Sequence, residues 1–80
     1  MSTYRLDYIS TDLDTNRECV ADQDWFEARD DTAAKNKASR LMQGWGRPAD
    51  PDTEHRGGRL WTLRGDDTAE TFVANVRSSV

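Results

Sequence analysis

Apolar and polar residues alternate in four segments of the chain, which is the pattern of strands that bury one face. At the N-terminus, Tyr4, Leu6 and Tyr8 alternate with charged residues. The side chains of a strand point alternately to its two faces, so these three residues are expected to share a buried side. The strands predicted in this way span about 3–10, 19–29, 59–64 and 71–76.

Residues 30–46 have instead the 3.6-residue period of a helix. The apolar positions that fall on one stripe of this helix are Ala34, Ala38, Leu41, Met42 and Trp45. Asp31, or alternatively Asp30, is a suitable N-cap, because a carboxylate accepts hydrogen bonds from the free amides of the first turn. Gly44 or Gly46 is a suitable C-terminal end.

The remaining internal segment, 47–58, has prolines, paired glycines and no regular period, which predicts a flexible loop. The element order is then β-β-α-β-β. We expect residues 1–80 to form a single small α+β domain, in which the helix packs on one face of a four-stranded, mostly antiparallel sheet. The other face is expected to be open to water or to a partner. The aromatic residues expected to pack against the helix are Tyr4, Tyr8, Phe26, Trp61 and Phe72.

Composition and charge describe a small acidic domain. A chain of 80 residues has a marginal core, so a partner or a second copy would stabilise it. The net charge of −4 is unevenly distributed, because acidic residues dominate 1–31 and basic residues dominate 32–64. No apolar segment has the length of a membrane span, and the N-terminus lacks the plan of a secretion signal. We therefore expect a cytoplasmic protein that is a monomer or a homodimer.

Few residues offer chemistry. Cys19 is the only cysteine, which excludes an internal disulfide, and His55 is far from it in the sequence. The chain has no phosphate-binding glycine loop, no paired zinc half-sites and no nucleophile elbow. We expect no catalytic residues, no cofactor and no enzymatic activity.

The segment TDLDTNRE, residues 11–18, places Asp12, Asp14 and Asn16 at alternate positions, as a calcium-binding loop does at its start. Such a loop also needs glycine at its sixth position and glutamate at its twelfth, where this chain has Arg17 and Gln23. We therefore expect no metal site. The alternatives are a polar hairpin loop whose side chains bond to the backbone, and a negatively charged docking surface.

Two surfaces are candidates for partner binding. Carboxylates on a hairpin can bind the basic groove of another protein, with an exposed tryptophan as an apolar anchor. The residues of this first surface are Asp12, Asp14, Glu18, Asp22, Asp24 and Trp25. The second surface would bind nucleic acid through Lys35, Lys37, Arg40, Arg47, Arg56 and Arg59. Because the net negative charge opposes phosphate binding, we expect a protein partner before nucleic acid.

The segment WFEARDDTAAKNKASRL follows a strand, and a variable loop and a closing hairpin come after it. Over most of the chain this architecture resembles several small phage-encoded anti-CRISPR proteins, and the packing residues of the strand-helix junction are its most specific part: Phe26, Ala28, Ala34 and Ala38. The resemblance implies an inhibitor that binds a CRISPR-Cas effector, with a type I surveillance complex as one candidate, and blocks the binding or cleavage of target DNA. The alternative is a small phage or bacterial accessory module that binds nucleic acid or a host protein through its basic helix and loop.

Overall fold

The structure, a computed structural model, describes residues 2–45, 51–63 and 70–77. Residues 65–69, between the last two predicted strands, lie outside these ranges. The elements are β1 (Ser2–Asp12), β2 (Arg17–Ala28), α1 (Asp31–Gln43), β3 (Thr53–Leu63) and β4 (Glu70–Arg77). Their order confirms the predicted β-β-α-β-β arrangement.

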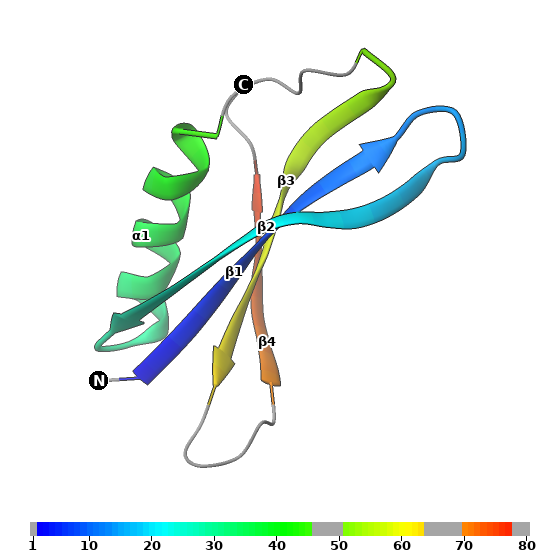
Figure 1. The fold of residues 1–80 in the computed structure, drawn as a ribbon. Helices are drawn as coiled ribbons and strands as arrows, with labels where there is room; N and C mark the ends of the chain where they lie inside the picture. Colours follow the sequence, from blue (N-terminus) through cyan, green and yellow to red (C-terminus); the bar gives the residue numbers. More distant parts are fainter. Residues whose placement is uncertain (1, 46–50, 64–69, 78–80) are drawn as a thin grey trace.

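The strands form one antiparallel sheet in the order β2-β1-β3-β4, and α1 lies on one face of it (Figure 1). This arrangement confirms the predicted α+β class. The end of the β1–β2 hairpin extends past the helix, beside the start of β3 (Figure 1). There the backbone N–H of Leu13 donates a hydrogen bond of 2.7 Å to the carbonyl oxygen of Asp52. The hairpin is thereby tied to the rest of the sheet close to its tip.

The ends of α1 are those that the sequence predicts. The side chain of Asp30 caps the first turn by accepting a hydrogen bond of 2.8 Å from the N–H of Ala33, which satisfies an amide that has no partner within the helix. Gly44 is the C-cap.

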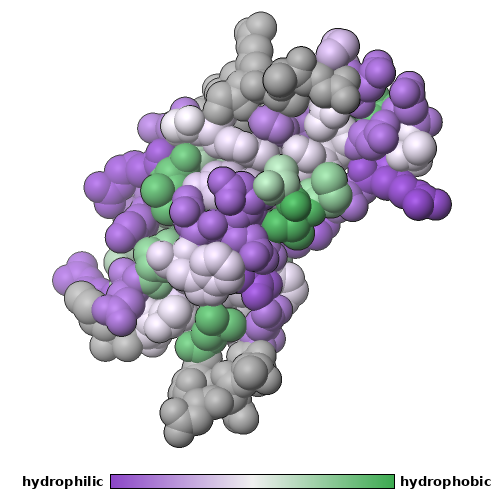
Figure 2. Space-filling view, viewed as in Figure 1, coloured by the Kyte–Doolittle hydropathy of each residue, from purple (hydrophilic) through white to green (hydrophobic). Residues whose placement is uncertain are grey.

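In the space-filling view, hydrophilic residues cover most of the visible surface and hydrophobic residues form small separate patches (Figure 2).

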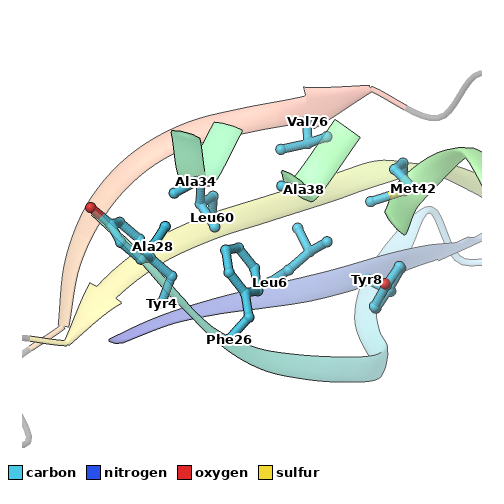
Figure 3. Close-up of a cluster of buried hydrophobic side chains, with 10 residues drawn as sticks. All are labelled: Tyr4, Leu6, Tyr8, Phe26, Ala28, Ala34, Ala38, Met42, Leu60 and Val76. Atoms are coloured by element: carbon cyan, nitrogen blue, oxygen red, sulfur yellow. The ribbon is translucent and has the colours of Figure 1, made fainter. Parts of the chain in front are cut away.

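The hydrophobic core lies between α1 and the sheet (Figure 3). The helix contributes Ala34, Ala38 and Met42, each with 0% exposure, and this confirms the predicted apolar stripe. The two alanines are short, so the helix backbone approaches the strands closely at these positions. The buried cluster consists of Tyr4, Leu6, Tyr8, Phe26, Ala28, Ala34, Ala38, Met42, Leu60 and Val76.

Two aromatic residues that were predicted to pack in this core lie on the opposite face of the sheet. Leu60 is buried beneath α1, so its neighbour Trp61 faces away. The register of β3 and β4 then shifts, because Leu60 pairs with Ala74 whereas Trp61 pairs with Phe72. The extra residue of this β-bulge is Val73, which packs against the core and leaves Phe72 facing away with 47% exposure. The prediction that Trp61 and Phe72 pack against the helix is therefore wrong.

β3 begins at Thr53, so the second half of the predicted loop 47–58 is part of a strand. Thr53 pairs with Asp12 of β1, and this backbone pairing forms the strand without any apolar alternation. The second of the paired glycines serves helix packing, because a Cβ atom at Gly58 would lie 2.7 Å from Cε of Met42. Residues 47–50 of the predicted loop lie outside the described ranges.

Candidate interaction surface

Asp12 and Asp14 lie exposed at the tip of the β1–β2 hairpin. The backbone N–H of Asp14 donates a hydrogen bond of 2.9 Å to Oδ1 of Asp12, which is the bonding expected of a polar turn. Asn16 has a φ of 56°, in the left-handed region that asparagine tolerates better than most residues. Within the described residues, no group of three or more His, Cys, Asp or Glu side chains is arranged to hold a metal ion. The tip is thus a polar turn that presents carboxylates.

A β-bulge in β2 divides the other predicted partner residues between the two faces of the sheet. The register of β1 and β2 shifts between Tyr8 and Ile9, so the alternation of sides slips by one residue at Ala21. Asp22 and Asp24 lie on the side that carries α1, whereas Glu18 and Trp25 lie on the side without a helix, which we call the helix-free face. The six predicted residues therefore do not form one continuous surface.

The carboxylates on the helix side are used within the protein. Oδ2 of Asp24 accepts a hydrogen bond of 2.5 Å from the hydroxyl of Tyr8, and Oδ1 of Asp22 accepts one of 2.8 Å from the N–H of Gln23. Burial raises the pKa of Tyr8, and the hydrogen bond to Asp24 raises it further. The Tyr8 ring also packs against Trp45, with the ring centres 5.1 Å apart. Asp24 therefore binds Tyr8 within the protein and does not add a free carboxylate to the exposed surface.

The raised pKa of Tyr8 predicts a loss of stability at alkaline pH. The unfolded chain releases the hydroxyl proton of Tyr8 near about pH 10, as free tyrosine does, whereas the folded protein retains it at that pH. The stabilisation is complete below about pH 10 and is lost as the pH rises toward the higher pKa of the folded state. We expect urea unfolding between about pH 8 and pH 11 to show this loss, and the loss to be smaller in Tyr8→Phe.

The Tyr8→Phe variant should keep part of the alkaline loss. The pKa of Tyr4 is also raised, by burial and then by the hydrogen bond of 2.7 Å from its hydroxyl to Asp31. Equal alkaline losses in the wild-type protein and in Tyr8→Phe would contradict the prediction.

The helix-free face carries a row of side chains that crosses all four strands at one level. Arg5 of β1 pairs with Trp25 of β2 on one side and with Trp61 of β3 on the other. Trp61 pairs in turn with Phe72 of β4. We call Trp25, Arg5, Trp61 and Phe72, in that spatial order, the cross-strand row. Its two ends are exposed, Trp25 at 58% and Phe72 at 47%.

Within the cross-strand row, Arg5 and the aromatic rings are in contact. The guanidinium carbon of Arg5 lies 5.9 Å from the centre of the Trp61 ring, within the range of a cation–π interaction. The rings of Trp61 and Phe72 meet edge to face, with their centres 5.4 Å apart. These contacts fix the centre of the row and leave the outer aromatic residues accessible.

Carboxylates neutralise the charge of Arg5. The guanidinium donates hydrogen bonds of 2.8 and 3.1 Å to Asp7, and one of 3.1 Å to Glu70. The side-chain amide of Gln23 donates a further hydrogen bond of 2.9 Å to Asp7, which is only 5% exposed. The hydrogen bonds with Glu70 raise the pKa of Arg5, so it stays charged. A buried ion pair needs such complete bonding to offset its desolvation, and the bonding holds Arg5 in one position.

Sequence reasoning did not find this network. Arg5 and Asp7 are two residues apart on one strand, so their shared side could have been inferred from the alternation. Glu70 is 65 positions from Arg5, and only the strand order brings the two together.

The basic residues of the alternative surface are separated as well. The ammonium group of Lys37 on α1 lies 5.2 Å from the centre of the Phe26 ring. Arg59 forms an ion pair with Glu18 on the helix-free face, and Arg56 forms one of 2.9 Å with a neighbouring glutamate. Two of the predicted cations are thus neutralised within the protein.

Comparison with known proteins adds no assignment, because no protein-family model, no curated protein and no solved structure matches this chain. In the parts of the chain that the structure describes, no helix is long and apolar enough to cross a membrane. The function must therefore be argued from the surfaces described above.

Proposed function

We propose that the protein is a non-catalytic cytoplasmic inhibitor that binds a CRISPR-Cas effector and blocks the binding or cleavage of target DNA. The observation that carries this proposal is the exposed acidic tip of the β1–β2 hairpin, which projects past the helix (Figure 1). The class of partner comes from the resemblance to small phage-encoded anti-CRISPR proteins. A type I surveillance complex is the first effector to test.

The charge of the hairpin supports this partner. Residues 12–24 contain five carboxylates and one arginine, a net charge of −4. A projecting acidic segment is attracted to a basic groove that normally holds nucleic acid, and such attraction accelerates association. Glu18 and Asp24 already have partners within the protein. Asp12 and Asp14 at the tip are therefore the leading contacts with the effector.

Reversing Asp12, Asp14 and Glu18 to lysine together is expected to abolish inhibition, weakening binding to the effector by more than about 30-fold, or about 2 kcal/mol. All three side chains are exposed, and the lost ion pair of Glu18 contributes at most about 1 kcal/mol, so Tm should change little. The measurement is target-DNA binding by a purified type I surveillance complex, together with thermal unfolding of each variant.

The control is a charge reversal on α1 instead of the hairpin. Lys35→Glu combined with Arg40→Glu changes two exposed residues of α1 and should leave inhibition intact. Full inhibition by the triple lysine variant would refute the role of the acidic hairpin.

A second candidate function is a small accessory module that binds nucleic acid. One observation favours it: a shallow depression of about 170 Å³ on the sheet is lined by Arg56, Arg59 and Arg77 beside Gly57 and Gly58, with Glu18, the partner of Arg59, also in its lining. Guanidinium groups bind phosphate well, and the glycines leave space for it. A salt-sensitive gel shift with bare DNA or RNA, lost in Arg77→Glu, would favour this function over inhibition. The net charge of −4 places it second.

A further inference from the structure

We propose that the helix-free face is a homodimer interface, covered by the same face of a second copy of the chain. The exposed ends of the cross-strand row, Trp25 and Phe72, are large apolar side chains on this face that a partner would bury, and Val20, opposite Ile9, is a third. This inference does not rest on the acidic hairpin tip, and it goes beyond the proposed inhibition.

Because of the strand order, the cross-strand row read from β2 to β4 is complementary to the same row read from β4 to β2. A two-fold axis that runs along the strands, between two facing sheets, places β2 over β4 of the second copy and β1 over β3. Trp25 then meets Phe72 of the second copy, and Arg5 meets Trp61. Aromatic pairs and guanidinium-indole pairs are both favourable contacts. The same contacts occur twice, as the symmetry requires.

The next level of the sheet has the same property. Its residues, in spatial order, are Gln23, Asp7, Arg59 and Asn75. Under the same rotation Asp7 faces Arg59 of the second copy, so a carboxylate faces a guanidinium group. Gln23 faces Asn75, so an amide faces an amide that can both donate and accept hydrogen bonds. Two successive levels therefore place chemically compatible residues opposite one another.

The composition of this face also favours protein over nucleic acid. Three of the four residues of the cross-strand row are aromatic, and the cations Arg5 and Arg59 are paired with carboxylates of the same chain. Protein interfaces have an aromatic core with few free charges, surrounded by a polar rim, and tryptophan and arginine are frequent among their most important residues. Nucleic acid would instead require free cations to neutralise phosphates.

The size of the face predicts a weak dimer. Four strands and four levels of side chains cover about 20 by 25 Å, which gives about 1,000 Å² of surface buried in total by the two copies. This value is near the lower limit of specific interfaces. At the rim, Glu27 would also meet Glu70 of the second copy, a like-charged pair. We expect a dissociation constant between about 10 μM and 1 mM.

Sedimentation of the purified chain, residues 1–80, between about 10 μM and 1 mM tests the association. The wild-type protein is expected to change from monomer to dimer over this range. Trp25→Lys and Phe72→Lys should each raise the dissociation constant at least about tenfold, because a charge replaces an aromatic contact. The matched control is Leu13→Lys, which changes a side chain of 50% exposure at the hairpin tip and should dimerise like the wild type.

Disulfide trapping tests the register of the two copies. In a Cys19→Ser background, Gln23→Cys combined with Asn75→Cys is expected to give a cross-link between position 23 of one copy and position 75 of the other. Within one chain the two positions lie on the edge strands, about 14 Å apart, too far for a disulfide. Each single cysteine variant is the control and should remain uncross-linked.

Three results would overturn the dimer. The first is a wild-type chain that remains monomeric at about 1 mM, the upper end of the expected range of dissociation constants. The second is a dimer that Trp25→Lys and Phe72→Lys leave unchanged. The third is a monomer whose inhibition of the effector is abolished by the same two variants, which would assign this face to the effector. Sedimentation uses the protein alone, so a failure of the proposed inhibition would not affect its outcome.

Discussion

Gly58→Ala is expected to destabilise the protein by about 1–3 kcal/mol, because the added methyl group has no space between the sheet and the helix. A Cβ atom at this position would lie 2.7 Å from Cε of Met42 and 3.2 Å from Cδ1 of Leu6, and it would also collide with the carbonyl oxygen of Asp7. The methionine side chain can move, but the carbonyl group is held in the ladder between β1 and β3. Either the strand or the helix must therefore shift.

The control is an alanine at a glycine that has space. Gly44 caps α1 with a φ of −80°, and the nearest atom to an added Cβ is the carbonyl oxygen of Leu41 at 3.6 Å. Gly44→Ala should change the free energy of unfolding by no more than about 0.5 kcal/mol. Urea unfolding followed by tryptophan fluorescence compares the two variants with the wild type. Equal midpoints for Gly58→Ala and Gly44→Ala would contradict the close packing at Gly58.

The helix could be predicted from the sequence because its determinants are local. Ala34, Ala38 and Met42 recur at the spacing of one helix face, and all three are buried. The N-cap, Asp30, lies next to the segment that it caps. These features depend on residues within a few positions of one another, so they remain valid whatever the helix packs against.

The faces of the strands were harder to predict. In β3, both sets of alternate positions contain apolar residues, Leu60 on one and Trp61 on the other, so alternation alone does not decide which of them faces the helix. In β4 the bulge at Val73 reverses the side of Phe72, and such a bulge arises from pairing with another strand. The aromatic size of Trp61 and Phe72 suggested a core position, whereas the residues of β3 and β4 that belong to the buried cluster are the smaller Leu60 and Val76.

The candidate surfaces show the same division. The polar turn at Asp12 and Asp14 could be predicted because it is local, and the structure bears it out. The division of Asp22 and Glu18 between two faces could not, since it follows from the bulge at Ala21. The cross-strand row depends on the order of all four strands, and no segment of the sequence contains that information.

Leu6→Ala is expected to cost about 2–5 kcal/mol, the usual range for truncating a fully buried leucine. Leu6 is 0% exposed at the centre of the sheet, where β1 lies between β2 and β3, and neither neighbouring strand can move inward to fill the cavity without breaking its pairing. A small domain has a total stability of about 5 kcal/mol or slightly more, which is close to the expected loss. Much of the variant should therefore be unfolded at about 37 °C. Urea unfolding measures the loss.

Leu13→Ala is the matched control for Leu6→Ala, because Leu13 is 50% exposed and its truncation should cost less than about 0.5 kcal/mol. Phe72→Lys provides a second comparison, since its side chain lies on the helix-free face and not in the core. We expect Leu6→Ala to lower the unfolding midpoint at every protein concentration, and Phe72→Lys to act on the concentration-dependent association. Similar unfolding midpoints for Leu6→Ala and Leu13→Ala would show that the core does not lie between α1 and the face of the sheet that carries Leu6.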